Sequence, residues 1–146
     1  MIIEPMNASH VSQIAQLEKR CFSDPWSEKN IASELDNPLS AWLVAVEAGK
    51  VVGYVGSQTV LGETDMMNLA VAPEARRQGT GRALVLALVD ELTKKGSHSL
   101  MLEVRVSNTP ARTLYESLGF SQVGRRTKYY VNPREDALIL RKEWSV

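Results

Sequence analysis

The sequence predicts an α/β fold of the α+β kind, with a mixed, mostly antiparallel central sheet of about seven strands flanked by about four helices. Two observations predict it. Seven short runs are strand-like, and four other segments have apolar residues at helical spacing or clear capping signals. The length of 146 residues, without repeats, linkers or low-complexity tracts, predicts a single domain over residues 1–146.

The first half of the chain supplies four strands and two helices. A short strand over residues 2–4 precedes a helix over residues 8–22, and Ser27 is the predicted N-cap of a second helix that runs to residue 35. That helix ends at Asn37–Pro38, because a residue before proline avoids helical angles. The runs "AWLVAVE", "VVGYVGSQTV" and "MMNLAV", with the turns "AGK" and "LGETD" between them, then predict an antiparallel meander.

The second half supplies two more helices and three strands. A helix over residues 80–95 precedes the strand "SLMLEV". Thr109 as N-cap, Pro110 in the first turn and Gly119 just past the end mark the next helix, "ARTLYESL". Two last strands, "FSQVGRR" and "DALILRK", flank the predicted loop "TKYYVNPRE".

Composition is typical of a globular protein in a reducing compartment, and we expect a cytoplasmic one. Seventeen basic and 17 acidic side chains give a net charge of zero, which does not suggest direct binding of nucleic acid. Residues 1–65 carry nine acidic and four basic side chains, and residues 66–146 carry eight and thirteen. This asymmetry suits a phosphorylated ligand and a cationic partner, but two solvated faces that differ by chance explain it equally well. The sequence has no secretory signal and no apolar run of membrane-spanning length.

A glycine-rich stretch, "RRQGTGRA", stands between a strand and a helix. The first N–H groups of a helix have no intrahelical partner, and the helix dipole adds partial positive charge there. Glycines at positions 79 and 81 allow a close approach of the backbone, and Arg76, Arg77 and Arg82 can add contacts to phosphate. The stretch predicts an anion site, most naturally for a pyrophosphate. The alternative is a glycine-rich helix start with solvated arginines.

Two common phosphate-binding motifs do not fit this stretch. A P-loop needs a lysine that is absent here. A dinucleotide-binding fingerprint needs a third glycine where Leu84 stands, after the first strand of a βαβ unit.

The stretch "NLAVAPEARRQGTGRALV" resembles the acetyl-CoA-binding segment of the GCN5-related N-acetyltransferase (GNAT) superfamily, with Arg76, Gly79 and Gly81 at the spacing (R/Q)-x-x-G-x-(G/A). The order of strands and helices resembles that fold from end to end. The resemblance implies acetyl-CoA as cosubstrate. It also implies a set of residues that contact the coenzyme through backbone or side chain: Leu69, Ala70, Val71, Arg77, Gln78, Gly79, Thr80, Gly81, Arg82 and Asn108.

The resemblance implies two catalytic residues. Glu103 matches the proton acceptor of the family, and alternation in "SLMLEV" places it on the face opposite Leu100, Leu102 and Val104. A carboxylate among apolar neighbours tends to have a raised pKa, which suits a general base. The alternative for Glu103 is a strand-end carboxylate paired with Arg105. Tyr115 matches the proton donor to the leaving thiolate, and its alternative is a core tyrosine beside Leu118.

The resemblance extends over nearly the whole chain to the subfamily that acetylates the N-terminal alanine of small-subunit ribosomal protein eighteen, through "DPWSEK", "LEVRVSNTPARTLYESLGF" and "KYYVNPREDALIL". Trp26, Tyr129 and Tyr130 are candidate walls for the peptide N-terminus, with hairpin packing an equal alternative for the tyrosines. Rival functions are acetylation of lysine, a polyamine or another small amine, and a non-catalytic coenzyme-binding module.

We expect a monomer or weak oligomer, with no membrane partner, no metal and no covalent enzyme intermediate. One cysteine and two histidines are too few for a structural zinc site or a plausible Cys–His pair. Cys21 is predicted to be a small core residue.

Overall fold

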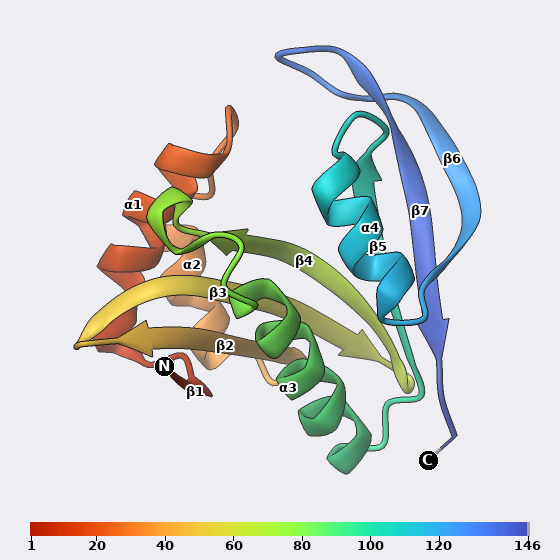
Figure 1. The fold of residues 1–146 in the computed structure, drawn as a ribbon. Coiled ribbons are helices and arrows are strands. Elements are labelled where there is room, and N and C mark those ends of the chain that lie inside the picture. The colour runs from red at the N-terminus through yellow and green to blue at the C-terminus, as the bar shows by residue number, and fades with distance from the viewer. Residues whose placement is uncertain (146) are drawn as a thin grey trace.

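The structure is a computed structural model that describes residues 1–145. Within that range the chain forms one seven-stranded sheet and four α-helices, as the sequence predicts (Figure 1). In chain order these elements are β1 (Ile2–Pro5), α1 (Val11–Cys21), α2 (Glu28–Ser33), β2 (Ser40–Glu47), β3 (Lys50–Val60), β4 (Glu63–Val71), α3 (Thr80–Lys94), β5 (Ser99–Arg105), α4 (Thr109–Ser117), β6 (Ser121–Tyr130) and β7 (Glu135–Glu143). Short 3₁₀ helices lie at Ala8–His10, Glu34–Asp36 and Pro73–Ala75.

The strands lie in the order β1-β2-β3-β4-β5-β7-β6, and every neighbouring pair is antiparallel except β4 with β5. A two-residue turn joins β3 to β4, in which Leu61 and Gly62 have φ of 52° and 80°. Two positive φ values match the twist of the strands that such a turn connects. β4 therefore begins at Glu63, so the prediction of a five-residue turn "LGETD" is wrong in its last three residues.

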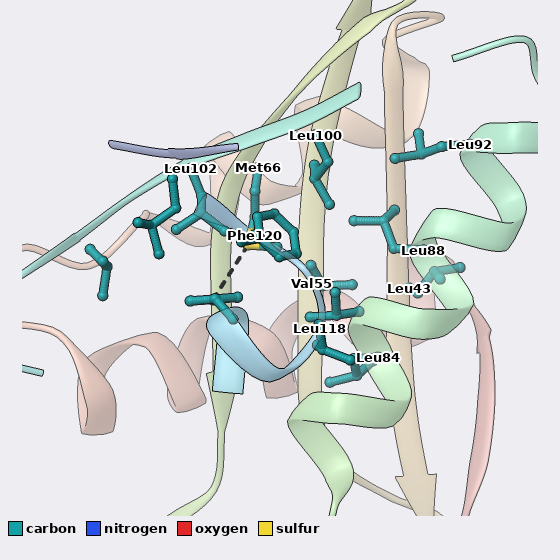
Figure 2. Packing of buried hydrophobic residues seen from close by; sticks show 14 of the residues in the cluster. Leu43, Val55, Met66, Leu84, Leu88, Leu92, Leu100, Leu102, Leu118 and Phe120 are labelled. Carbon is teal, nitrogen blue, oxygen red and sulfur yellow. Dashed lines mark hydrogen bonds between the residues drawn. The ribbon is translucent and has the colours of Figure 1, made fainter. Parts of the chain in front are cut away.

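Helices cover both faces of the sheet (Figure 1). On one face, side chains of α1 and α2 form a cluster with Trp42 and Tyr54 of β2 and β3. On the other face lie α3 and α4, and Leu84 and Leu88 of α3 pack against Val55 and its neighbours in the sheet (Figure 2). Each such leucine is fully buried, which stabilises the fold by roughly 1.5–3 kcal/mol relative to an exposed side chain.

Two helix starts test the predicted caps. The Ser27 hydroxyl accepts a hydrogen bond from the Asn30 N–H (3.1 Å), which confirms it as the N-cap of α2. The N-cap of α4 is Asn108, not Thr109 as predicted, and its Oδ1 accepts from the Ala111 N–H at 3.2 Å. Asparagine is the stronger N-cap of the two, so Thr109 becomes the first helical residue.

The predicted loop "TKYYVNPRE" is wrong over its first half and at its last residue, because β6 continues to Tyr130 and β7 begins at Glu135, with which Tyr130 pairs. The ladder is irregular between Arg126 and Tyr130, and Lys128 has a φ of 53°. The side chain of Asp136 compensates by accepting the Lys128 N–H at 2.7 Å. Tyrosines favour strands, and a side chain that satisfies the irregular backbone lets the strand continue through them.

β4 and β5 pair over three positions only: Glu63 with Ser99, Thr64 with Leu100 and Asp65 with Met101. β4 continues to Val71 and β5 to Arg105, and the two strands diverge from their shared start (Figure 1).

A β-bulge lies in β4 where the separation begins. Met66 pairs with Ser57 of β3 and Asn68 pairs with Gly56, which leaves Met67 as the extra residue. Without the bulge, Met66 and Asn68 would share one face of the sheet. With it, Met66 packs with the α3 and α4 side chains, whereas Asn68 bonds to Glu18 of α1 on the other face.

Candidate active site

The start of α3 lies where the sequence predicts an anion site, and its backbone has the open donors that such a site needs. Gly79 is the N-cap, with a φ of 81° that favours glycine. The first intrahelical bond runs from the Ala83 N–H to the Gly79 carbonyl (2.9 Å). The N–H groups of Thr80, Gly81 and Arg82 therefore have no acceptor within the helix. A Cβ placed on Gly79 would meet nothing within 4 Å, so the backbone there is open to a ligand.

Three residues predicted to contact the coenzyme, Arg77, Gln78 and Arg82, lie at this helix start and are exposed. Arg77 has a φ of 64° and is exposed. The amide of Gln78 donates weakly to the Glu74 carbonyl (3.4 Å), and the Arg82 guanidinium donates to the Ser117 hydroxyl (3.0 Å). Gln78 and Arg82 are thus held by neighbouring segments close to the free N–H groups.

Arg76 has a different place from the other loop cations. Its Nε donates to the Val71 carbonyl at the end of β4 (3.1 Å), and its Nη2 lies 3.6 Å from the Cys21 sulfur. Arg76 therefore ties the glycine-rich loop to β4 and to α1. Cys21 is half-buried and packs against the α1 cluster, close to the predicted core position.

The predicted backbone-contact residues lie on β4 beyond its last pair with β5. Leu69, Ala70 and Val71 pair with β3 on one side, and on the other side no strand among residues 1–145 pairs with them. Ala70 is buried, and its two neighbours are half-buried. These three residues therefore belong to a buried strand whose edge away from β3 pairs with no described strand, although Arg76 donates to the Val71 carbonyl.

Glu103 lies on β5 beyond the same point. Leu100, Leu102 and Val104 are buried against the α3 and α4 side of the sheet, and Glu103 points to the other face, as the alternation predicts. Its side chain keeps 24% of its surface exposed. The carboxylate therefore meets solvent on the face opposite to α4.

The ion pair predicted as an alternative for Glu103 is wrong in its partner. Glu103 Oε1 lies 3.3 Å from the Nε of Arg126 on β6. Arg105 bonds instead to the carbonyls of Val131 (3.2 Å) and Pro133 (2.8 Å), and it lies 3.4 Å from Glu135. Arg105 thereby holds the turn between β6 and β7.

Tyr115 lies on α4 with 5% of its surface exposed and packs edge-on against Phe120. Its hydroxyl has one weak partner in the described chain, the Met66 sulfur at 3.7 Å. Burial raises the pKa of the Tyr115 phenol above its ordinary value, and nearby Tyr130 adds to the rise. The phenol is therefore protonated at neutral pH and has a proton that no strong acceptor holds. The alternative of a core tyrosine is also met, since Leu118 lies in the same cluster.

Tyr130 lies within electrostatic range of both predicted catalytic residues. Burial raises the pKa of Tyr130 to about 12, with smaller contributions from Tyr129 and from the Glu103 carboxylate. The guanidinium of Arg105 lies 4.3 Å from the centre of the Tyr130 ring. Tyr129 packs edge-on against Tyr130 and keeps 51% of its surface exposed.

Trp26, the third predicted wall residue, lies in the loop between α1 and α2. Its ring packs edge-on against Trp42, with centroids 5.4 Å apart. A surface hollow is lined by this loop and α2: Asp24, Pro25, Trp26, Asn30 and Ser33. Trp26 and the tyrosine pair belong to two separate parts of the molecule, the α1–α2 loop and the β6–β7 hairpin.

A polar network that the sequence did not predict surrounds Glu18, which is 1% exposed on the apolar side of α1. Its Oε1 accepts from the Trp26 N–H (2.8 Å), and its Oε2 accepts from the Asn68 amide (2.8 Å) and from the Tyr54 hydroxyl. A signal existed in the sequence. Glu18 stands four residues after Ile14, within the apolar stripe of a helix, where an unpaired carboxylate is unfavourable.

Residues 1–145 contain no group of three or more histidine, cysteine or acidic side chains arranged to hold a metal ion. No helix in this part of the chain is both long and apolar enough to cross a membrane.

Comparisons with known proteins bear on this site. The family model described as "Acetyltransferase (GNAT) family" matches residues 11–120. A ribosomal protein bS18 alanine N-acetyltransferase from Escherichia coli strain K12 is 40% identical over 140 residues, which cover 94% of this chain and 94% of that protein.

Solved structures show the same likeness. A crystal structure of the ribosomal protein alanine N-acetyltransferase from Escherichia coli matches with a TM-score of 0.91 at 39% identity, over 99% of this chain and 94% of that one. A crystal structure of Arabidopsis thaliana NAA60 in complex with acetyl-CoA has the same fold, with a TM-score of 0.89 at 18% identity over 97% of each chain. The chain therefore belongs to the GNAT family of acetyltransferases.

Proposed function

We propose that this protein transfers the acetyl group of acetyl-CoA to the α-amine of an N-terminal alanine, and that its acceptor is ribosomal protein bS18. The support is a relative named for that activity, 40% identical over almost all of both chains. A ribosomal acceptor places the reaction in the cytoplasm. We expect the enzyme to act as a monomer or weak oligomer, without direct binding of nucleic acid.

One observation carries the assignment of the catalytic centre. β4 and β5 stop pairing after Asp65 and Met101, and Glu103 and Tyr115 lie beyond that point on opposite faces of the sheet. An acetyl group held between the separated strands would have a carboxylate on one side and a protonated phenol on the other. Acyl transfer to an amine needs a base and an acid in that relation.

The coenzyme lies, in this proposal, along β4 and at the start of α3. Its pyrophosphate accepts from the N–H groups that follow Gly79, with Gln78, Arg77 and Arg82 beside it. The unpaired edge of β4 at residues 69–71 offers backbone groups to the pantetheine arm. Asn108, whose oxygen caps α4, has its amide nitrogen available for the coenzyme.

The chemistry proceeds by direct attack of the acceptor amine on the thioester carbon. The new C–N bond forms, the C–S bond breaks, and the sulfur leaves with the bonding electron pair. The amine gives up a proton to Glu103, either directly or through water, and the thiolate takes a proton from Tyr115. Solvent then returns Glu103 and Tyr115 to their starting protonation states, and the products are the amide and free coenzyme thiol.

An α-amine suits a base of modest strength. Its reference pKa of about 7.7–8.0 leaves a larger neutral fraction at pH 7 than the value of about 10.4 for lysine. Trp26 of the α1–α2 loop and Tyr129 and Tyr130 of the β6–β7 hairpin are the proposed walls for the incoming peptide.

The test measures thiol release from acetyl-CoA with two short basic peptides. One peptide has a free N-terminal alanine and no lysine, and the other has a blocked N-terminus and an internal lysine. Turnover with the first alone is the expected result. Turnover with the second alone would replace the acceptor by lysine. Silence with both, despite calorimetric binding of acetyl-CoA, would favour a small-molecule acceptor or a non-catalytic module.

The role of Glu103 is tested by Glu103→Gln, which keeps the shape of the side chain and removes the base. We expect kcat to fall by about 10²–10⁴-fold, with the KM for acetyl-CoA little changed. Glu63→Gln is a matched control, because Glu63 also lies on a strand and pairs with an arginine, Arg141, at 3.2 Å. Equal kcat for both variants would remove Glu103 from the mechanism.

A further inference from the structure

The buried carboxylate of Glu18 joins α1 to three other segments of the chain. It belongs to α1, it accepts from the backbone of the α1–α2 loop at Trp26 (2.8 Å), and it accepts from Asn68 next to the β4 bulge (2.8 Å). The Tyr54 hydroxyl of β3 completes the set. The bonded donors are neutral: one backbone N–H, one side-chain amide and one phenol.

Such a group is costly to bury. A carboxylate with 1% exposure and no cation bonded to it loses its hydration, and burial raises the pKa of Glu18 as a result. An apolar residue at this position would complete the stripe of α1 without that cost. A carboxylate at this position therefore calls for a role other than core packing.

The segments that Glu18 joins carry a stack of aromatic rings. Trp26 packs edge-on on Trp42, and Trp42 stacks on Tyr54 with centroids 5.6 Å apart and planes 5° from parallel. The Trp42 indole lies directly over Gly56, where an added Cβ would come within 2.6 Å of three ring atoms. Gly56 is the β3 partner of both Trp42 and Asn68, so the stack and the bulge share one row of the sheet.

The same bulge begins the separation of β4 from β5. Asp65 makes the last β4–β5 pair, Met67 is the extra residue, and Asn68 follows it. Glu18 thus bonds both to the loop that carries Trp26 and to Asn68 beside the opening in the sheet.

We propose that Glu18 is a positioning residue for the peptide acceptor, which links the Trp26 loop to the β4 bulge at Asn68 and so sets the acceptor wall relative to the reacting centre. This inference rests on the proposed function. Glu18 itself is buried and touches neither substrate. The proposed coenzyme site at Gly79 is not part of the link between Trp26, Glu18 and Asn68. The affinity of the protein for acetyl-CoA should therefore not depend on Glu18.

The sharpest test reverses the hydrogen-bond roles inside the link. Asn68→Asp is isosteric and places a second carboxyl where an amide donated to Glu18. At a pH well above the raised pKa of the pair, both groups are ionised and the two like charges push the bulge and the loop apart, so the kinetics are measured there. Adding Glu18→Gln restores the pairing, because the Gln oxygen accepts the Trp26 N–H and its NH₂ donates to the new aspartate.

The measurement is steady-state kinetics with the alanine peptide and acetyl-CoA varied in turn, on the full chain. For Asn68→Asp we expect the peptide KM to rise by about tenfold or more, with the acetyl-CoA KM within about twofold of wild type. The double variant should return the peptide KM to within about threefold of wild type. Asn37→Asp is the matched control, because the Asn37 amide donates to another buried glutamate, Glu34, at 3.1 Å. It should leave both KM values unchanged.

The outcomes separate cleanly. An inactive wild-type protein would refute the proposed function and not this link. If Asn68→Asp lowers kcat and leaves both KM values unchanged, the variant has only lost folded protein, and the positioning role is overturned. Failure of the double variant to restore the peptide KM would overturn it as well. If Asn68→Asp does not fold, Asn68→Ala removes the same contact without a new charge. An unchanged peptide KM in that variant would also overturn the proposal.

Discussion

Single side chains in this protein do different work from what their sequence neighbours suggest. Arg105 follows Glu103 by two residues on the same face of β5, yet it bonds to the β6–β7 turn, and Arg126 of β6 takes the place beside Glu103. The register of three strands decides this exchange, and no local pattern records it. In contrast, the orientation of Glu103 follows from the alternation of one strand and is predicted correctly.

Tyr115→Phe separates catalysis from stability at this scale. We expect kcat to fall by about 10²-fold or more, because the leaving thiolate loses its proton donor. The free energy of unfolding should change by less than about 1 kcal/mol, because within residues 1–145 the hydroxyl has only the Met66 sulfur as partner. Urea unfolding and steady-state kinetics on the same preparation check both. A large loss of stability with unchanged kcat would leave Tyr115 as a core residue alone.

The phenol also predicts a pH profile. Because burial raises the pKa of Tyr115 above its ordinary value of 10, its ionisation should not lower kcat at any pH below about 10. A falling limb between pH 7 and 9 that disappears in Tyr115→Phe would contradict this.

Glu18 predicts a pH dependence of stability. Burial raises its pKa above the ordinary value of 4.5, so the folded state holds a proton that the unfolded chain releases as the pH rises. Its contribution is therefore fully present below about pH 4.5 and is lost as the pH rises through the folded pKa. Glu18→Gln should lack this pH dependence. The free energy of unfolding of the variant, relative to that of wild type, should therefore increase from about pH 4 upward. Parallel curves in urea titrations at several pH values would contradict the shift.

At the scale of elements, the start of α3 depends on one glycine. Gly79→Val should raise the KM for acetyl-CoA by about tenfold or more, because the branched side chain occupies the space open to phosphate. It also strains a left-handed backbone by roughly 1–2 kcal/mol. Gly79→Asn is the control. Asparagine tolerates a positive φ, so this variant shows the effect of an added side chain without the backbone strain. An acetyl-CoA KM that stays at the wild-type value in Gly79→Val would move the phosphate site elsewhere.

Elements were predicted well where their signals are local. The helix start at Thr80 and the cap at Ser27 depend on residues within one turn, and both are confirmed. Boundaries failed where a distant group decides them. β6 continues to Tyr130 because Asp136, on the next strand, satisfies the irregular backbone at Lys128.

At the scale of the whole molecule, the two parts of the sheet meet through three β4–β5 pairs and the helices packed over them. The proposed coenzyme site spans this junction, so acetyl-CoA should stabilise the fold as a whole. At 100 times its Kd the ligand adds about 2.7 kcal/mol, which corresponds to a rise in Tm of about 5–10 °C for a protein of this size. Differential scanning calorimetry with and without acetyl-CoA checks it. Gly79→Val should show a clearly smaller rise at the same concentration, and an equal rise would contradict the assigned phosphate site.

The overall order of strands and helices was predictable because each element carries its own periodicity. The separation of β4 from β5 was not, because the run "MMNLAV" reads as an unbroken strand and nothing in it marks Met67 as a bulge. The Glu18 network escaped for a similar reason, since its partners are 8, 36 and 50 residues away. The predicted site residues fall around the opening, and the opening itself needed the structure.

The short β4–β5 ladder has a consequence for the order of events in turnover. In the proposed mechanism, a base on one face and an acid on the other leave room for both substrates at once, approaching from opposite sides of the same sheet. Neither product has to depart before the second reactant arrives. Initial-rate plots at several fixed acceptor concentrations should therefore give intersecting lines, the signature of a ternary complex, and parallel lines would indicate an acetylated enzyme instead.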